Sequence, residues 1–135
     1  FLILKEPKRI PFVLKSIALF VLIRSLFITL THIGPFPDQM SFVANVPNIL
    51  QNFMFGGDLF FSGHTGAPFL MGLIFWSDIR LRLLFIATAV LFGVVVLLAH
   101  LHYSIDVLSA FFITYTIFHI SKYLFKADYQ TFLNG

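Results

Sequence analysis

The sequence predicts an all-α fold, a polytopic membrane helix bundle with four transmembrane helices. Two properties of the composition support this class. The first is the balance of residue types, since 59% of residues are hydrophobic and only 11% are charged; the second is the mean hydropathy of +0.92. An average soluble domain is roughly half apolar and about a quarter charged. The third observation is that the apolar residues gather in runs, and about 20 such residues suffice to cross the hydrocarbon core of a bilayer.

Three runs are long enough to span a membrane, and a further one, second in chain order, is shorter and more broken. In chain order the four runs cover Pro11 to Thr31, Leu59 to Trp76, Leu83 to Ala99 and Ile105 to Phe125. None resembles a cleavable signal peptide, because each is too long and lacks a cleavage pattern. We expect a single domain over residues 1–135. The chain opens on Phe1 rather than Met, so we expect upstream sequence to be missing.

The basic residues predict how the helices are oriented. Eight of the nine fall in alternating connections, at the start of the first span, between the second and third, and at the end of the fourth: Lys5, Lys8, Arg9, Lys15, Arg80, Arg82, Lys122 and Lys126. The positive-inside rule places these connections in the cytoplasm. Because the basic residues flank apolar helices, the net charge of +3 predicts no nucleic-acid partner. The absence of Cys excludes cysteine nucleophiles and cysteine metal sites.

The opposite, extracytoplasmic side receives most of the histidines. Those at the outer ends of spans are His32, His64, His100 and His102, whereas His119 lies toward the other end. Asp106 follows His102 by four residues, and residues at i and i+4 share a helix face. A carboxylate in that position can hold the imidazole tautomer and stabilise its cation. A lone interfacial histidine such as His32 or His100 is more often only a polar contact.

A second feature of this side is the polarity of the helices. The second and fourth spans both run inward, so both present their N-termini, with unpaired N–H groups and positive dipole ends, to the outer side. Such termini bind phosphate. In the segment Ser62-Gly63-His64-Thr65-Gly66, glycine permits close approach to the backbone, and Ser62 and Thr65 add hydroxyl groups. The pattern therefore predicts a phosphate site beside His64.

Arg24 offers a counter-charge for that site. It lies in the middle third of the first span, and a charge within a membrane helix is costly and usually faces a partner or a cavity. The alternatives are that Arg24 snorkels to the interface, or pairs with Asp58 or with a missing helix.

Two longer segments carry a family resemblance. GDLFFSGHT, residues 57–65, and AHLHYSIDV, residues 99–107, resemble the active-site motifs of the sphingomyelin synthases, a branch of the type 2 phosphatidic acid phosphatase (lipid phosphate phosphatase) superfamily. The segment RSLFITLT, residues 24–31, is weakly similar to the arginine- and threonine-bearing helix of that branch. The resemblance covers about Val21 to Phe125.

The resemblance implies a six-helix membrane enzyme of which this chain supplies the last four helices. It implies that His102 is the nucleophile toward phosphorus, that Asp106 orients it, and that His64 transfers protons, without a metal or other cofactor. The implied substrate is a lipid in the membrane whose phosphorus-containing head group is transferred or hydrolysed at the extracytoplasmic face. The expected substrate-binding residues are Arg24, Asp58, Ser62, Gly63 and Thr65.

The departures from the wider superfamily narrow the resemblance. Ordinary members carry a Lys and Arg-Pro motif, a Pro before Ser-Gly-His, and a Ser-Arg pair upstream of the nucleophilic histidine. Here the first motif is not visible, Phe61 replaces the Pro, and Val95-Val96 occupy the Ser-Arg position. These differences favour the sphingomyelin synthase branch over a generic phosphatase, but they leave the head group and the acceptor open.

Three functions remain in view. The first is the lipid head-group transferase, with a phosphatase that releases inorganic phosphate as its alternative. The second is a metal or haem protein that uses His64, His100 and His102, and the third is an inactive membrane scaffold that lacks the phosphate-binding arginines. In the first case we expect the loop from Gly34 to Leu59 to border the lipid entrance, because long loops of this kind are often lids or binding loops.

Overall fold

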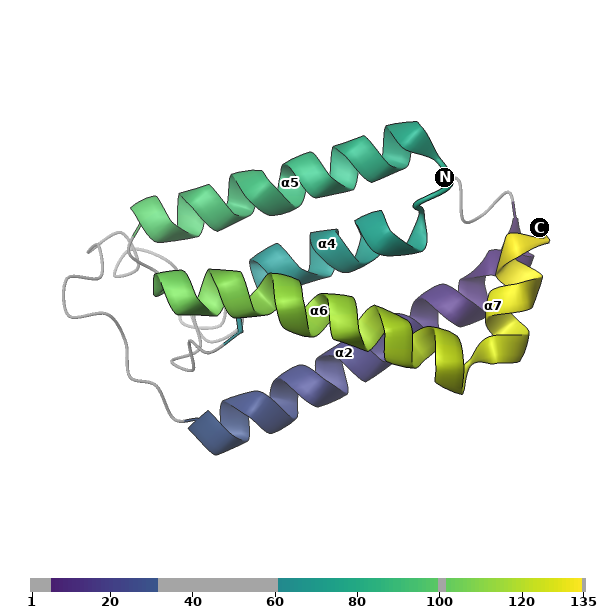
Figure 1. Ribbon diagram of the computed structural model, residues 1–135, viewed down its shortest axis with the longest axis horizontal. Coiled ribbons are helices and arrows are strands. Elements are labelled where there is room, and N and C mark those ends of the chain that lie inside the picture. Colours follow the sequence, from purple (N-terminus) through teal and green to yellow (C-terminus); the bar gives the residue numbers. More distant parts are fainter. Residues whose placement is uncertain (1–5, 32–60, 100–101, 135) are drawn as a thin grey trace, which may run out of the picture.

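The computed structural model describes residues 6–31, 61–99 and 102–134, and these residues form helices joined by short turns (Figure 1). In chain order the elements are the 3₁₀ helix η1 (Pro7–Arg9) and the α-helices α2 (Ile10–Thr31), α4 (Gly63–Ile74), α5 (Ile79–Leu98), α6 (Ser104–Leu124) and α7 (Lys126–Leu133). No strand occurs within the described ranges. The all-α prediction is therefore confirmed for this part of the chain.

Three of the four predicted membrane spans are confirmed as helices of sufficient length and apolar character. They are the continuous helical segment Pro7–Thr31, which joins η1 to α2, and the helices α5 and α6. The remaining predicted span, second in chain order, is not confirmed. Its helix α4 has 12 residues, which gives a length of about 18 Å, whereas the hydrocarbon core is about 30 Å thick. Residues 59 and 60 of the predicted span lie outside the described residues.

The polar residues between α4 and α5 explain where these two helices end and begin. Asp78 is the N-cap of α5, where its carboxylate accepts hydrogen bonds from the backbone N–H groups of Arg80 (2.9 Å) and Leu81 (3.2 Å). The Arg82 guanidinium lies 4.7 Å from the centre of the Trp76 ring and donates to the Trp76 carbonyl. The helix therefore starts four residues before the predicted Leu83, with both arginines in its first turn.

Helix α4 lies between its neighbours and packs against α2, α5 and α6. Figure 1 shows that α4 and α6 begin at the same end of the bundle, where α2 and α5 finish, while η1 and α7 lie at the opposite end. The basic residues of η1, of the first turn of α5 and of α7 therefore share one end, as their alternation predicts. The N-termini of α4 and α6 share the other end.

Gly66 allows the closest approach between α4 and its neighbours. A Cβ atom at this position would lie 2.9 Å from the Phe20 ring and 2.9 Å from Thr114 Oγ1. Alanine in place of a helical glycine ordinarily stabilises a helix by about 0.5–1 kcal/mol, but overpacking costs about 1–3 kcal/mol. We expect Gly66→Ala to lower the unfolding temperature of the detergent-solubilised protein, and a rise would contradict this packing.

Helix α7 is an element that the sequence interpretation missed. It crosses the end of the bundle at η1 and is held by an ion pair between Asp128 Oδ2 and Lys15 Nζ (2.6 Å). Phe132 is buried, with its ring centre 5.6 Å from that of Phe12 and 5.7 Å from that of Phe75. These aromatic contacts close the apolar core of the bundle at the basic end.

Candidate active site

The first turn of α6 brings His102 and Asp106 together. Both side chains are buried, with exposed fractions of 8% and 0%, and His102 Nδ1 lies 3.8 Å from Asp106 Oδ2. The same carboxylate oxygen accepts a 2.8 Å hydrogen bond from the Tyr103 backbone N–H, which fixes Asp106 at the start of the helix. The predicted i, i+4 pair is therefore a real neighbour pair, at the distance of an ion pair rather than of a short hydrogen bond.

The other oxygen of the Asp106 carboxylate can still accept a hydrogen bond. Asp106 Oδ1 is buried and accepts no hydrogen bond from the described residues. A buried polar atom without a partner costs free energy, and such atoms are found where function requires them or where a ligand completes the site. The carboxylate therefore has an acceptor position beyond its contacts with Tyr103 and His102.

The N-terminus of α4 lies directly against that of α6. The backbone N–H of Ser62 donates to the backbone carbonyl of Asp106 at 3.4 Å, and Ser62 is the N-cap of α4. His64 is the second residue of α4, with an exposed side chain. Two helix N-termini, His64 and the His102–Asp106 pair thus occupy one end of the bundle, where their dipoles favour an anion.

Arg24 reaches this region from α2. Its Nε donates a 3.3 Å hydrogen bond to the carbonyl of Phe61. A Cβ atom at Gly63 would lie 3.0 Å from the same Nε, so the guanidinium rests against the first residue of α4. The structure therefore places the Arg24 charge beside the N-terminus that carries His64. The counter-charge role of Arg24 stays a prediction.

The hydroxyl groups of Ser62 and Thr65 lie differently from the sequence expectation. Both residues are fully buried, and Thr65 Oγ1 donates to Ser62 Oγ at 3.4 Å. Ser62 makes no side-chain hydrogen bond to cap the helix. The pair faces the protein interior, so its observed contact is internal packing at the base of the site.

Phe61 is a residue of this site that the sequence interpretation treated only as a replacement for Pro. Its φ of 65° is in the left-handed region, where non-glycine residues are uncommon and strained. The side chain is fully buried, with its ring centre 5.2 Å from that of Phe20 and 6.5 Å from that of Phe27. These ring contacts hold the strained backbone whose carbonyl receives Arg24. The left-handed conformation left no signal in the sequence.

His64 is biased toward its neutral form. Its pKa lies below the ordinary value, first because the surrounding protein partly removes the ring from water, and second because the positive charge of Arg24 disfavours the imidazolium. A neutral imidazole can accept a proton at neutral pH, as a general base must.

The Arg24 contribution can be measured directly. In Arg24→Gln we expect the pKa of His64, followed by NMR titration of the imidazole, to rise toward its ordinary value, so that the ring becomes charged at higher pH than in the wild type. The matched control is Lys122→Gln, which removes a positive charge near the end of α6 that lies away from the site. An unchanged His64 titration in Arg24→Gln would show that the two groups do not interact.

Several predicted residues cannot be placed. Asp58, His32, His100 and the loop from Gly34 to Leu59, which we expected to border the lipid entrance, lie outside the described residues. Within the described ranges, no group of three His, Cys, Asp or Glu side chains is arranged to hold a metal ion. The metal or haem alternative included His100, so it rests on a residue that the structure does not describe.

Comparison with known proteins identifies one family match. Residues 56–123 match the family described as the PAP2 superfamily C-terminal domain. This segment contains α4, α5, nearly all of α6 and the paired helix N-termini described above. Neither the curated proteins nor the solved structures give a significant match to the chain.

Proposed function

Because the chain belongs to the PAP2 (type 2 phosphatidic acid phosphatase) superfamily, we propose that it is a membrane enzyme that transfers the phosphorus-containing head group of a lipid through His102. Membership in this superfamily indicates a lipid phosphatase or phosphotransferase type of function. The observation that carries the proposal is the buried His102–Asp106 pair in direct backbone contact with the N-terminus of α4.

The geometry supports a division of roles. Asp106 Oδ2 lies near Nδ1 of His102, so the carboxylate favours a proton on Nδ1 and leaves the lone pair on Nε2. In the proposed first step Nε2 attacks phosphorus and the P–O bond to the lipid alcohol breaks. The imidazolium form of His64, which its lowered pKa makes the less populated form at neutral pH, protonates the departing oxygen and becomes neutral. In the second step His64 takes a proton from the acceptor hydroxyl, whose oxygen attacks phosphorus and breaks the P–N bond to His102. Both imidazoles are then restored.

The charges on phosphorus need stabilisation in both steps. Two helix N-termini provide backbone N–H groups and positive dipole ends, and Arg24 adds a full charge beside Gly63. We propose Gly63, Ser62 and Thr65 as the segment that shapes this anion site, with Arg24 as its cation. We also propose Asp58 as a substrate-binding residue, and this proposal rests only on its position in the GDLFFSGHT motif.

The finer assignment is a head-group transferase similar to the sphingomyelin synthases. It is supported by the GDLFFSGHT and AHLHYSIDV motifs and by the residues at the Ser-Arg position of other superfamily members. Val96 at that position is buried, and its carbonyl accepts the backbone N–H of His102 at 3.4 Å. A cation is therefore replaced by packing and a backbone contact, which leaves Arg24 as the arginine placed beside the site within the described residues. We further propose that the site faces the extracytoplasmic side, because the basic connections lie at the opposite end.

The test is mass spectrometry of lipids after incubation of the full-length protein with phosphatidylcholine, phosphatidylethanolamine, phosphatidic acid and ceramide. A new sphingophospholipid with matching diacylglycerol supports head-group transfer, and free phosphate from phosphatidic acid supports the phosphatase alternative. His102→Ala should form neither product. Equal product patterns from the wild type and His102→Ala would reject the catalytic role of His102 and favour the inactive-scaffold alternative.

A further inference from the structure

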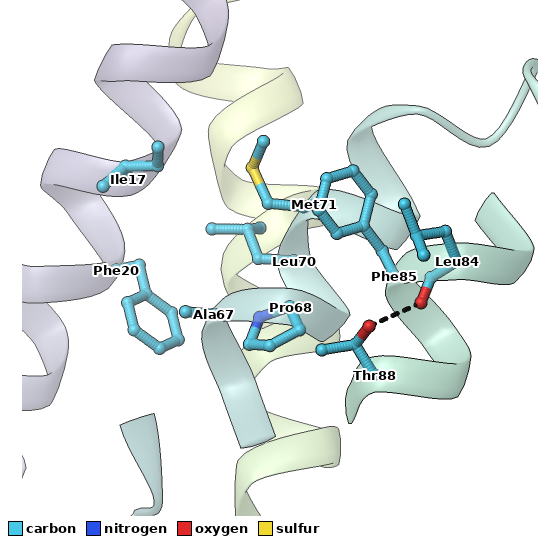
Figure 2. Close-up of a pocket in the computed structure, with 9 residues that line it drawn as sticks. All are labelled: Ile17, Phe20, Ala67, Pro68, Leu70, Met71, Leu84, Phe85 and Thr88. Carbon is cyan, nitrogen blue, oxygen red and sulfur yellow. Dashed lines mark hydrogen bonds between the residues drawn. The ribbon is translucent and has the colours of Figure 1, made fainter. Parts of the chain in front are cut away.

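An apolar groove runs along α4, between α2 and α5. Figure 2 shows Ile17 and Phe20 on one wall, Ala67, Pro68 and Met71 along α4, and side chains of α5 on the other wall. Its volume is about 380 Å³, in the range of small-molecule sites, about 300–1,000 Å³. The groove is therefore large enough for part of a lipid.

The described lining of the groove is almost entirely apolar. Among the described lining residues Thr88 alone carries a hydroxyl group, and Thr88 Oγ1 donates to the Leu84 carbonyl at 2.8 Å, within its own helix (Figure 2). The other lining residues are aliphatic, aromatic or thioether side chains. Met71 adds an adaptable surface, because its flexible thioether fits irregular shapes. Such a lining suits an alkyl chain, which has no hydrogen bonds to satisfy.

Two walls of the groove lead to charged or titratable residues of the candidate site. On α4, His64 precedes Ala67, Pro68 and Met71 by three, four and seven residues, so all four share one helix face. On α2, Ile17 and Phe20 precede Arg24 by seven and four residues and share a face with it. The groove is therefore apolar along its length, with the His64 imidazole on the continuation of its α4 face and the Arg24 guanidinium on the continuation of its α2 wall.

We propose that this groove holds one alkyl chain of the substrate lipid and so places the lipid phosphate at His64 and Arg24. The inference rests on the proposed function for the identity of the substrate. A chain anchored along Ala67 and Met71 positions the phosphorus at a set depth in the membrane. Selection would then depend on chain length as well as on the head group, because each methylene in an apolar site changes the binding free energy.

Photocrosslinking tests this binding mode without requiring turnover. The probes are phosphatidic acid and phosphatidylcholine that carry a diazirine within one acyl chain, added to the full-length protein in nanodiscs. We expect adducts, localised to single residues by peptide fragmentation, at groove positions such as Ile17 and Met71, in excess over exposed positions outside the groove such as Leu91 and Leu108. Adducts spread evenly over all lipid-facing surfaces would overturn the proposal.

Blocking the groove provides the matched control. Residues 1–135 contain no cysteine, so Ala67→Cys can be modified selectively within this sequence with an octyl methanethiosulfonate. The control is Ala87→Cys, because Ala87 is exposed and lies outside the groove. We expect the octyl group at position 67, but not at position 87, to abolish the groove adducts. Failure of the reagent to reach position 67, or persistence of the adducts after modification, would show that another protein segment fills the groove or that the chain binds elsewhere.

Turnover of the same proteins separates this inference from the proposed function. With long-chain substrate, the octyl group at position 67 should reduce kcat/KM roughly tenfold or more, while turnover of a water-soluble short-chain analogue stays unchanged. Groove adducts without any turnover would support the groove as an acyl-chain site and reject the proposed function. Turnover that is lost equally for both chain lengths would retain the function and reject the groove as an acyl-chain site.

Discussion

His102→Ala is expected to reduce turnover by roughly four to six orders of magnitude, the scale of loss when a covalent nucleophile is removed. The physical reason is that no other described imidazole lies beside Asp106: His102 Nδ1 is 3.8 Å from the carboxylate, whereas His64 is on a different helix. Truncation removes the atom that attacks phosphorus, so no lipid alcohol departs for His64 to protonate. Steady-state rates with the lipid identified by mass spectrometry provide the measurement.

The matched control for this substitution is His119→Ala. His119 lies on α6, the helix that follows His102, is exposed, and packs its ring against Tyr115 with centres 4.5 Å apart. We expect His119→Ala to retain nearly full activity, which would show that loss of a histidine from this part of the chain does not by itself inactivate the enzyme. A His102→Ala protein with a wild-type unfolding temperature and substantial residual turnover would contradict the nucleophile assignment.

Asp106→Asn is expected to lower kcat by roughly 10²–10⁴-fold, the scale seen when the carboxylate that orients a catalytic histidine becomes an amide. An amide oxygen can still accept the Tyr103 N–H hydrogen bond of 2.8 Å, so α6 should remain capped and folded. The amide has no charge to stabilise the imidazolium, and its N–H group competes as a donor. The loss should therefore fall on kcat, with stability largely kept.

Asp106→Ala separates the two roles of this carboxylate. Alanine removes the hydrogen bond from the backbone N–H of the N-cap residue Tyr103 as well as the charge, and the loss of a capping side chain costs about 1 kcal/mol. We expect Asp106→Ala to match Asp106→Asn in activity but to unfold at a lower temperature in thermal scans. If Asp106→Asn lost stability but kept its activity, Asp106 would be a structural cap only.

The sequence predicted well the features that depend on residues close together in the chain. The i, i+4 spacing placed His102 beside Asp106, and the alternation of apolar runs placed the N-termini of α4 and α6 at one end of the bundle. Both follow from helix periodicity and from chain direction. The apolar length of the second run was less informative, because α4 stops at Ile74 before a turn that leads to the Asp78 cap.

The residues that the sequence did not predict depend on contacts between distant segments. Helix α7 is held by the Lys15–Asp128 pair, whose members are 113 residues apart in the chain. The left-handed conformation of Phe61 depends on rings from α2 and on the acceptor that Arg24 requires. No local pattern encodes such contacts, because the strain at Phe61 is compensated by side chains from another helix.

The central claim, that His102 carries the head group during turnover, can be tested by rapid quenching and peptide mass spectrometry of the full-length enzyme. We predict an adduct on the peptide that contains His102, consisting of phosphate alone if the enzyme is a phosphatase and of phosphate with its alcohol if it is a head-group transferase. An adduct on His64 instead, or product formation at the wild-type rate by the His102→Ala protein, would contradict the claim.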